Sequence, residues 1–148
     1  MSKQDLVPYQ TTIEVRDACL CLHVQRAARA LARYFDEALR PCGLSNGQFS
    51  LLMSLNRPQP PRMKEVAATL AMDRTTLTAA LKPLERRGLV EVTIDPGDRR
   101  NRALTLTDEG RKTLATAVPI WRESHAAIEK RVPGSDAAGL RAALLALS

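Results

Sequence analysis

The sequence predicts a mainly α-helical fold that carries a small two-stranded β-sheet. The first observation is a short amphipathic segment followed at once by a longer one within residues 62–88, the pattern of two helices joined by a tight turn. The second is the alternation of apolar and polar residues over 90–94 and again over 104–106, which is typical of half-buried strands. A chain of 148 residues can bury one hydrophobic core, so we expect all these elements to share a single domain.

The first element is a long helix from residue 13 to residue 40, where apolar residues recur at spacings of three or four. Pro41 and Gly43 end it, because both residue types interrupt a helix. Residues 1–12 are polar, and we expect them to be loosely ordered.

The second helix has a clear N-terminal signal. Ser45 and Gln48 have the spacing of a capping box, in which each side chain bonds the other residue's backbone. Leu44 and Phe49 have the spacing of a hydrophobic staple across the same turn. The helix ends before the proline-rich stretch 58–61, which favours an extended link.

The next two helices form a pair, of which the second is the candidate recognition helix. It begins at Asp73, which suits an N-cap, and ends before Gly88, which suits the left-handed cap position. Its apolar face consists of Leu77, Leu81 and Leu84. The opposite face carries donors and acceptors for base edges and phosphates, namely Arg74, Thr75, Thr78 and Lys82, with Thr76 beside them. We therefore expect this helix to enter the major groove of DNA.

The predicted strands form a hairpin with a basic loop. Val90, Val92 and Ile94 alternate with polar residues in the first strand, and Leu104 and Leu106 do so in the second. The segment 95–98 has the proline and glycine of a tight turn, and it is followed by Arg99, Arg100 and Arg102. Such a hairpin suits the minor groove and completes a winged helix-turn-helix. The alternative is a solvated turn whose arginines only favour solubility.

The C-terminal third predicts two further helices. The longer one begins at Thr107 and has the spacing of helices that pack against helices, through Leu114, Val118, Trp121, His125, Ile128 and Val132. After a break at 133–135, an alanine-rich helix is expected over 136–147. These terminal helices are more apolar than a single reading head, the winged helix-turn-helix, needs. We therefore predict a homodimer whose two recognition helices lie about 10 base pairs apart on DNA. The alternative is that they complete the core of a single chain.

Composition narrows the class of protein. A net charge of +6 favours polyanionic partners, whereas 3% aromatic residues disfavour stacking on single-stranded nucleic acid. No apolar run is long enough to span a bilayer and the first residues are polar, so we expect no membrane association and a cytoplasmic location. An odd number of cysteines, three, fits a reducing compartment.

The sequence does not favour an enzyme. It has two histidines, no glycine-rich phosphate loop and no G-x-S-x-G motif, so we expect no catalytic residues and no cofactor. Cys19 and His23 lie one helical turn apart but make only half a metal site, and we expect no metal. A winged helix used only for protein–protein contact is a further alternative, although it would not need a basic recognition face.

Two stretches of the sequence, LERRGLVEV and DPGDRRNRALTLTDEG, resemble the MarR family of bacterial transcriptional regulators. The resemblance extends from about Cys19 to the C-terminus. It implies a winged helix-turn-helix homodimer, and many members of the family are repressors that small phenolic ligands or oxidants release from DNA. The sequence departs from the family at Met63, where many relatives have a small hydroxyl residue, and at Pro83 inside the recognition helix.

The resemblance also implies where an effector would act. A ligand pocket is expected between the dimerisation helices and the reading head, with His23, Met53 and Trp121 as candidates by their sequence positions. Some relatives instead sense hydroperoxides through one cysteine early in the first helix, a position that Cys21 occupies here. The tyrosine positions of those sensors hold Gln25, Phe35 and Asn46.

The sequence therefore predicts one domain over residues 1–148. Dimerisation helices at 13–40 and 107–148 flank a winged helix-turn-helix at 44–106. The predicted function is a sequence-specific regulator of transcription that binds double-stranded DNA at a pseudo-palindromic operator. We expect a repressor relieved by a small phenolic or other aromatic effector. An oxidant-sensing regulator that uses Cys21 is the alternative within the same fold.

Overall fold

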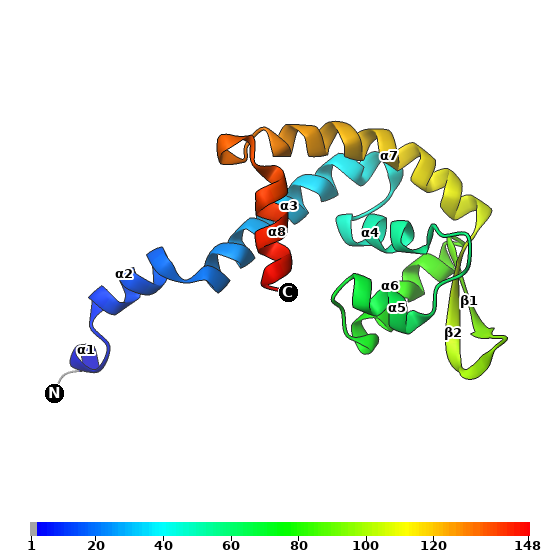
Figure 1. Cartoon of the computed structure of the whole chain (residues 1–148), viewed down its shortest axis with the longest axis horizontal. Coiled ribbons are helices and arrows are strands. Elements are labelled where there is room, and N and C mark those ends of the chain that lie inside the picture. Colours follow the sequence, from blue (N-terminus) through cyan, green and yellow to red (C-terminus); the bar gives the residue numbers. More distant parts are fainter. Residues whose placement is uncertain (1–2) are drawn as a thin grey trace. The chain divides into compact units, whose positions relative to one another are not determined.

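The computed structural model describes residues 3–148, which divide into two compact units, Met1–Tyr34 and Phe35–Ser148 (Figure 1). The first contains α1 (Lys3–Leu6), α2 (Tyr9–Ala18) and most of α3 (Leu20–Leu39), whose last turn belongs to the second unit.

The prediction of one continuous helix over 13–40 is wrong in two respects. The helical segment begins at Tyr9, directly after Pro8, whose extended backbone provides the N-cap of α2. It is then broken at Cys19, where φ is −69° and ψ is 110°, so that α2 and α3 are separate helices. The expectation that residues 1–12 are loosely ordered is likewise wrong for the described part, because α1 and the start of α2 lie there. Met1 and Ser2 are outside the described residues.

The chain leaves α3 through a 3-10 turn, η1 (Arg40–Cys42), and Gly43, which has a φ of 69°. Helix α4 (Asn46–Leu55) follows with the predicted capping box. The Ser45 hydroxyl accepts the Gln48 N–H at 3.1 Å, and the Gln48 side chain accepts the Ser45 N–H at 3.1 Å. Leu44 and Phe49 are both buried, as a hydrophobic staple requires.

Helices α5 (Met63–Thr69) and α6 (Arg74–Arg86) form the helix-turn-helix. Ala71 in the turn between them has a φ of 51°, an uncommon conformation for a residue with a Cβ. At the end of α6, Gly88 has a φ of 72°, while the Leu89 N–H reaches the Leu84 carbonyl at 3.0 Å. The predicted left-handed cap at Gly88 is therefore confirmed as a Schellman motif.

Strands β1 (Val90–Asp95) and β2 (Asp98–Leu106) form the antiparallel hairpin. The alternating burial predicted for the first strand fails at its end, because Ile94 is 56% exposed and Asp95 is buried. The register shifts between these two residues, which turns Asp95 inward where the alternation would place it outward. The prediction of a basic loop is also wrong. The wing arginines, Arg99, Arg100 and Arg102, lie within β2, and only the turn 96–97 connects the two strands.

Helix α7 (Asp108–Glu129) begins at the predicted Thr107 cap and ends before Val132, shorter than the sequence suggested. A 3-10 turn, η2 (Pro133–Ser135), leads to α8 (Ala137–Ala146). The core of the second unit lies where α4, α5, α6 and α7 meet the base of the hairpin. It contains fully buried leucines and a valine: Leu39, Leu51, Leu52, Val66, Leu77, Leu81, Leu84, Leu104 and Leu106. None of the helices in the described chain is long and apolar enough to cross a membrane.

Candidate nucleic-acid interface

The outer face of α6 is a polar surface held by an apolar inner face. Leu77, Leu81 and Leu84 are at most 1% exposed, which fixes the rotation of the helix about its axis. All five residues predicted for DNA contact on this helix are exposed: Arg74, Thr75, Thr76, Thr78 and Lys82. Four of them, with Ala79 and without Thr76, line a shallow concavity of about 410 Å³ on its surface. The structure therefore brings these side chains together on one face.

The N-terminus of α6 is organised by Asp73. One carboxylate oxygen accepts the Thr76 N–H at 2.8 Å, and the other accepts the Thr76 hydroxyl at 2.7 Å. These two bonds, the backbone bond first, lower the pKa of Asp73 below its ordinary value. Thr76 is thus occupied in the cap, which distinguishes it from Thr75 beside it.

Thr78 contacts both its own helix and α5. Its hydroxyl donates to the Arg74 carbonyl at 2.8 Å and lies 3.7 Å from the Met63 sulfur. Met63 is buried at 7% exposure. The Met63 side chain is therefore part of the packing between α5 and α6.

The tip of the hairpin is built by two aspartates. Asp98 accepts the Arg100 N–H at 3.0 Å and the Asn101 side-chain amide at 3.1 Å. Asp95 accepts the Gly97 N–H at 2.9 Å and pairs with Arg62, whose Nε lies 2.7 Å from its carboxylate. The turn is therefore fixed by carboxylates at both of its ends.

The three wing arginines are not equivalent. Arg99 and Arg100 are exposed, whereas Arg102 is half-buried and donates to the Arg99 carbonyl at 3.3 Å. Among the described side chains, no carboxylate forms an ion pair with any of these three arginines or with Arg74 or Lys82. These cations are therefore available to an external anion, and Arg102 also shapes the tip itself.

The hairpin and the recognition helix belong to one structural unit. Helix α6 packs against β1, and α5 packs against both α6 and β2. Figure 1 shows the hairpin beside this helix pair. A polar helix face and an arginine-bearing hairpin in one unit match the chemistry of major- and minor-groove contacts to duplex DNA.

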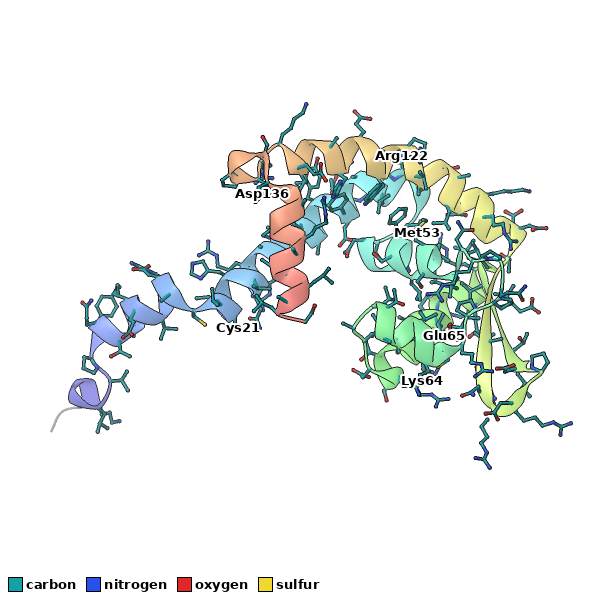
Figure 2. All side chains as sticks on the ribbon, in the orientation of Figure 1. Cys21, Met53, Lys64, Glu65, Arg122 and Asp136 are labelled. Carbon is teal, nitrogen blue, oxygen red and sulfur yellow. The ribbon has the colours of Figure 1, made fainter. Side chains whose placement is uncertain are left out.

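A second candidate site is a cavity of about 530 Å³ among α4, the end of α5 and α7. Its lining consists of Phe49, Ser50, Met53, Ser54, Thr69, Leu70, Val118, Trp121 and Arg122. Two of the three residues predicted for an effector pocket, Met53 and Trp121, thus line the same cavity. Figure 2 marks Met53 on α4 and Arg122 on α7. The third, His23, is exposed and belongs to the first unit.

Aromatic rings form one side of this cavity. Trp121 stacks on His125 with ring centroids 4.7 Å apart and on Phe49 at 6.2 Å. The His125 Nδ1 atom lies 3.5 Å from the Glu129 carboxylate, which also pairs with Arg141 of α8 at 2.9 Å. The cavity wall is therefore linked through side chains to the last helix.

The cysteine region of the first unit contains no arrangement of ligands for a metal. Cys21 is exposed, and its sulfur lies 3.5 Å from the Gln25 side-chain amide. The His23 Nδ1 atom lies 2.7 Å from the Cys19 carbonyl oxygen. Within the described residues, no group of three or more histidine, cysteine or acidic side chains is placed to hold a metal ion.

Sequence reasoning missed two features of these sites. Arg122 follows the predicted Trp121 directly, and a helical pattern alone does not show that both neighbours line one cavity. The Arg62–Asp95 pair joins residues far apart in the chain, and only the unexpected burial of Asp95 reveals it. Asp95 was expected in the turn at 95–98, and no local signal in the sequence indicated its burial.

Comparison with known proteins places the chain in a family. Residues 44–101 match the model of the MarR family. The transcriptional repressor NicR of Pseudomonas putida is 32% identical over 97% of this chain and 85% of its own length. The structure is similar to that of the regulator MosR of M. tuberculosis in complex with DNA. That similarity has a TM-score of 0.80 and 40% identity, over 87% of this chain and 92% of MosR.

A third similarity is to CouR of Rhodococcus jostii RHA1 bound to p-coumaroyl-CoA. Its TM-score is 0.75 at 26% identity, over 88% of this chain and 92% of CouR. The family match covers the reading head, and the relatives extend it over nearly all of the chain. The protein therefore belongs to the MarR family of transcriptional regulators.

Proposed function

We propose that the protein is a repressor that binds a pseudo-palindromic DNA operator as a homodimer and is released by a small aromatic effector. The single observation that carries this proposal is the cationic array on α6 and β2. Its five cations, of which four are exposed and Arg102 is half-buried, form no ion pair with a carboxylate among the described side chains. Hydroxyl groups between these cations suit base edges, and the guanidinium groups suit phosphates. The DNA complex of the related MosR supports the same assignment.

In this mechanism the two surfaces have different tasks. Residues Arg74, Thr75, Thr78 and Lys82 contact the major groove, with Thr76 holding the helix cap beside them. The arginines at 99, 100 and 102 hold the hairpin at the minor groove. The first surface determines which sequences bind, and the second adds affinity that depends little on sequence.

Exposed apolar side chains on α8 support the homodimer. Leu140, Leu144 and Leu145 of α8, and Leu147 directly after it, are between 44% and 73% exposed in the single chain. In the first unit, Leu20 is 69% exposed and Val15 is 51% exposed. Burying such surfaces against a second copy would release about 25 cal/mol for each Å² removed from water. A dimer also presents two recognition helices to the two halves of an operator.

The effector proposal rests on the cavity among α4, α5 and α7. A stacked wall of Phe49 and Trp121 suits a flat ring, and Arg122 provides a cation for a carboxylate. The structure of CouR with p-coumaroyl-CoA supports an aromatic acid derivative as the ligand class. Such a ligand would release DNA if it bound more tightly to a form with differently spaced recognition helices.

A salt titration tests the DNA assignment. The logarithm of the association constant for duplex DNA should fall linearly with the logarithm of salt concentration, by about 0.9 for each phosphate neutralised. A constant independent of salt would contradict it and favour a winged helix used for protein contact.

The effector assignment has a direct optical test, because Trp121 is the single tryptophan of the chain. Aromatic carboxylates that release DNA should change its fluorescence. Arg122→Gln should weaken their binding roughly tenfold while leaving the binding of the matching neutral amides unchanged. Equal losses for the acids and the amides would remove Arg122 from the site.

A thiol response through Cys21 is a second proposal, favoured by the exposure of this residue. Peroxide should then lower the DNA affinity of the native protein but not of Cys21→Ser. An unchanged affinity of the native protein would rule this response out. The cytoplasm, where the operator lies, is the proposed location for either mechanism.

A further inference from the structure

We propose that Arg62 is a positioning residue for the wing, which acts through Asp95 to hold Arg99 and Arg100 at the DNA. This inference rests on the proposed DNA-binding function. It assigns a role to a residue that lies outside both groove-contacting surfaces, at the N-cap of α5.

The first observation is the burial of Asp95. Its side chain is 12% exposed. Among the residues whose exposure the structure describes, Asp95 is the one buried charged residue. A buried carboxylate is costly unless each oxygen has a partner. One oxygen of Asp95 accepts the Gly97 N–H at 2.9 Å and the other pairs with the Arg62 Nε at 2.7 Å. The carboxylate therefore connects the turn of the wing to the start of α5.

The second observation is the register of the hairpin. Ile94 pairs with Arg102, but the next residue, Asp95, pairs with Asp98. The three residues between those partners, Arg99, Arg100 and Asn101, thus have no opposite residue in β1. The ladder does not fix the two exposed arginines, so their position depends on the side-chain bonds that hold the tip.

The third observation is the place of the Arg62 contact along the hairpin. Closer to its base, the Leu104 N–H donates to the Pro61 carbonyl at 3.0 Å, and Arg62 forms an isolated bridge with Ala103. The ion pair of Arg62 reaches further, to the residue before the turn. Figure 2 marks Lys64 and Glu65 in the first turn of α5, two and three residues after Arg62 in the chain. The start of α5 is thereby coupled to the tip, and the recognition helix packs on α5.

Two other roles for Arg62 make different predictions. If Arg62 contacted a phosphate directly, removing the negative charge of Asp95 would leave DNA binding unchanged or strengthen it. If the pair served stability alone, variants that remain folded would keep the native salt dependence. If Arg62 positions the wing, Asp95→Asn must weaken binding although it makes the protein more positive.

The experiment measures operator affinity against salt concentration for the full-length protein, at a temperature where each variant is folded. Arg99→Ala/Arg100→Ala should lower the steepness of the salt dependence by up to about 1.8, the contribution of two phosphate contacts. Arg62→Met and Asp95→Asn should each lower it by about 1. Arg62→Lys, which keeps a donor for the carboxylate, should restore most of the native steepness. Arg111→Met is the matched control, because Arg111 loses the same charge from an ion pair with Asp108 on α7.

A second arm combines the changes. Adding Arg62→Met to Arg99→Ala/Arg100→Ala should change affinity by less than about twofold, because the wing arginines are already absent. A further loss of tenfold or more, or an Asp95→Asn variant that binds as well as the native protein, would overturn the inference. If Arg99→Ala/Arg100→Ala itself binds DNA with native salt dependence, the wing does not contact phosphate. In that case the inference fails together with the wing part of the proposed function.

Discussion

At the N-terminus of α6, two neighbouring threonines differ in their hydrogen bonds although the sequence predicts DNA contact for both. The hydroxyl of Thr76 donates to Asp73, whereas Thr75 is exposed and lines the concavity on the outer face. The side chain that is free to meet a base edge is therefore Thr75.

We predict that Thr75→Val changes the preferred base at one position of each half-site and leaves the melting temperature unchanged. Thr76→Val should leave the preference unchanged and lower the melting temperature by roughly 1–3 °C, because the cap loses a bond. Sequence selection from a duplex pool and thermal unfolding measure the two effects. An altered preference in Thr76→Val would contradict this division.

Two carboxylates that accept hydrogen bonds at helix N-termini make the free energy of unfolding depend on pH in the acid range. The pKa of Asp36 is lowered because its carboxylate accepts the Asn46 backbone N–H and then the Asn46 side-chain amide, both at 2.7 Å. The pKa of Asp73 is lowered by its bonds to Thr76. Since the folded pKa lies below the unfolded value of about 3.9, this stabilisation is present at neutral pH. It is lost as the pH falls through the folded values.

We therefore expect the free energy of unfolding to decrease as the pH falls below about 4. Asp36→Asn should be less stable than the native protein at pH 7, with a smaller difference at pH 3. Urea unfolding at the two pH values measures this change. A difference that stays constant would show that Asp36 does not contribute through its charge.

At the scale of elements, the sequence correctly predicted the helix caps that hydrogen bonds between nearby residues determine. The capping box of α4, the Asp73 cap and the Schellman motif after α6 each involve residues a few positions apart, and each is confirmed. The break at Cys19 could not be predicted, because neither a glycine nor a proline lies there. The inward turn of Asp95 depends on Arg62, which lies more than thirty residues away, so periodicity alone could not reveal it.

Packing between α7 and the base of the hairpin gives a stability prediction. A Cβ at Gly110, in the first turn of α7, would meet the Leu89 carbonyl oxygen and approach the Leu106 Cδ1 atom to 2.7 Å. Gly110→Ala should therefore lower the free energy of unfolding by about 1–3 kcal/mol.

Gly47→Ala is the matched control for this change. In α4 the nearest atom to a new Cβ would be the Ser45 hydroxyl at 4.0 Å, so the change should be neutral or stabilising by up to about 1 kcal/mol. Urea unfolding of both variants tests the contrast. Equal stabilities would mean that α7 does not lie tightly on the hairpin base.

At the scale of the whole molecule, the sequence predicted what kind of site each surface forms better than it predicted which residues take part. The exposed face of α6 was predicted correctly because an apolar stripe fixes which face is buried, whereas its contact with DNA stays a prediction. Met53 and Trp121 were proposed by position in the family and line one cavity, but their role as effector contacts stays a prediction. Arg122 and Arg62 could not be found, because their partners are brought to them only by tertiary packing.

The exposed leucines of α8 provide a test of assembly. We expect Leu144→Glu to shift the protein from dimer to monomer at micromolar concentration, because a charge would be buried in the interface. Operator affinity should fall by roughly 100-fold or more with the loss of the second recognition helix. Analytical ultracentrifugation measures the mass, and Thr116→Glu, an exposed change on α7, is the control. A native protein that sediments as a monomer would refute the homodimer.

Selection of bound sequences from a random duplex pool tests the central assignment most directly. Two exposed recognition helices in one dimer should enrich a pair of inverted half-sites whose centres lie about 10 base pairs apart. Enrichment of no sequence, or of one half-site without its inverted repeat, would contradict a dimeric regulator that reads DNA through α6.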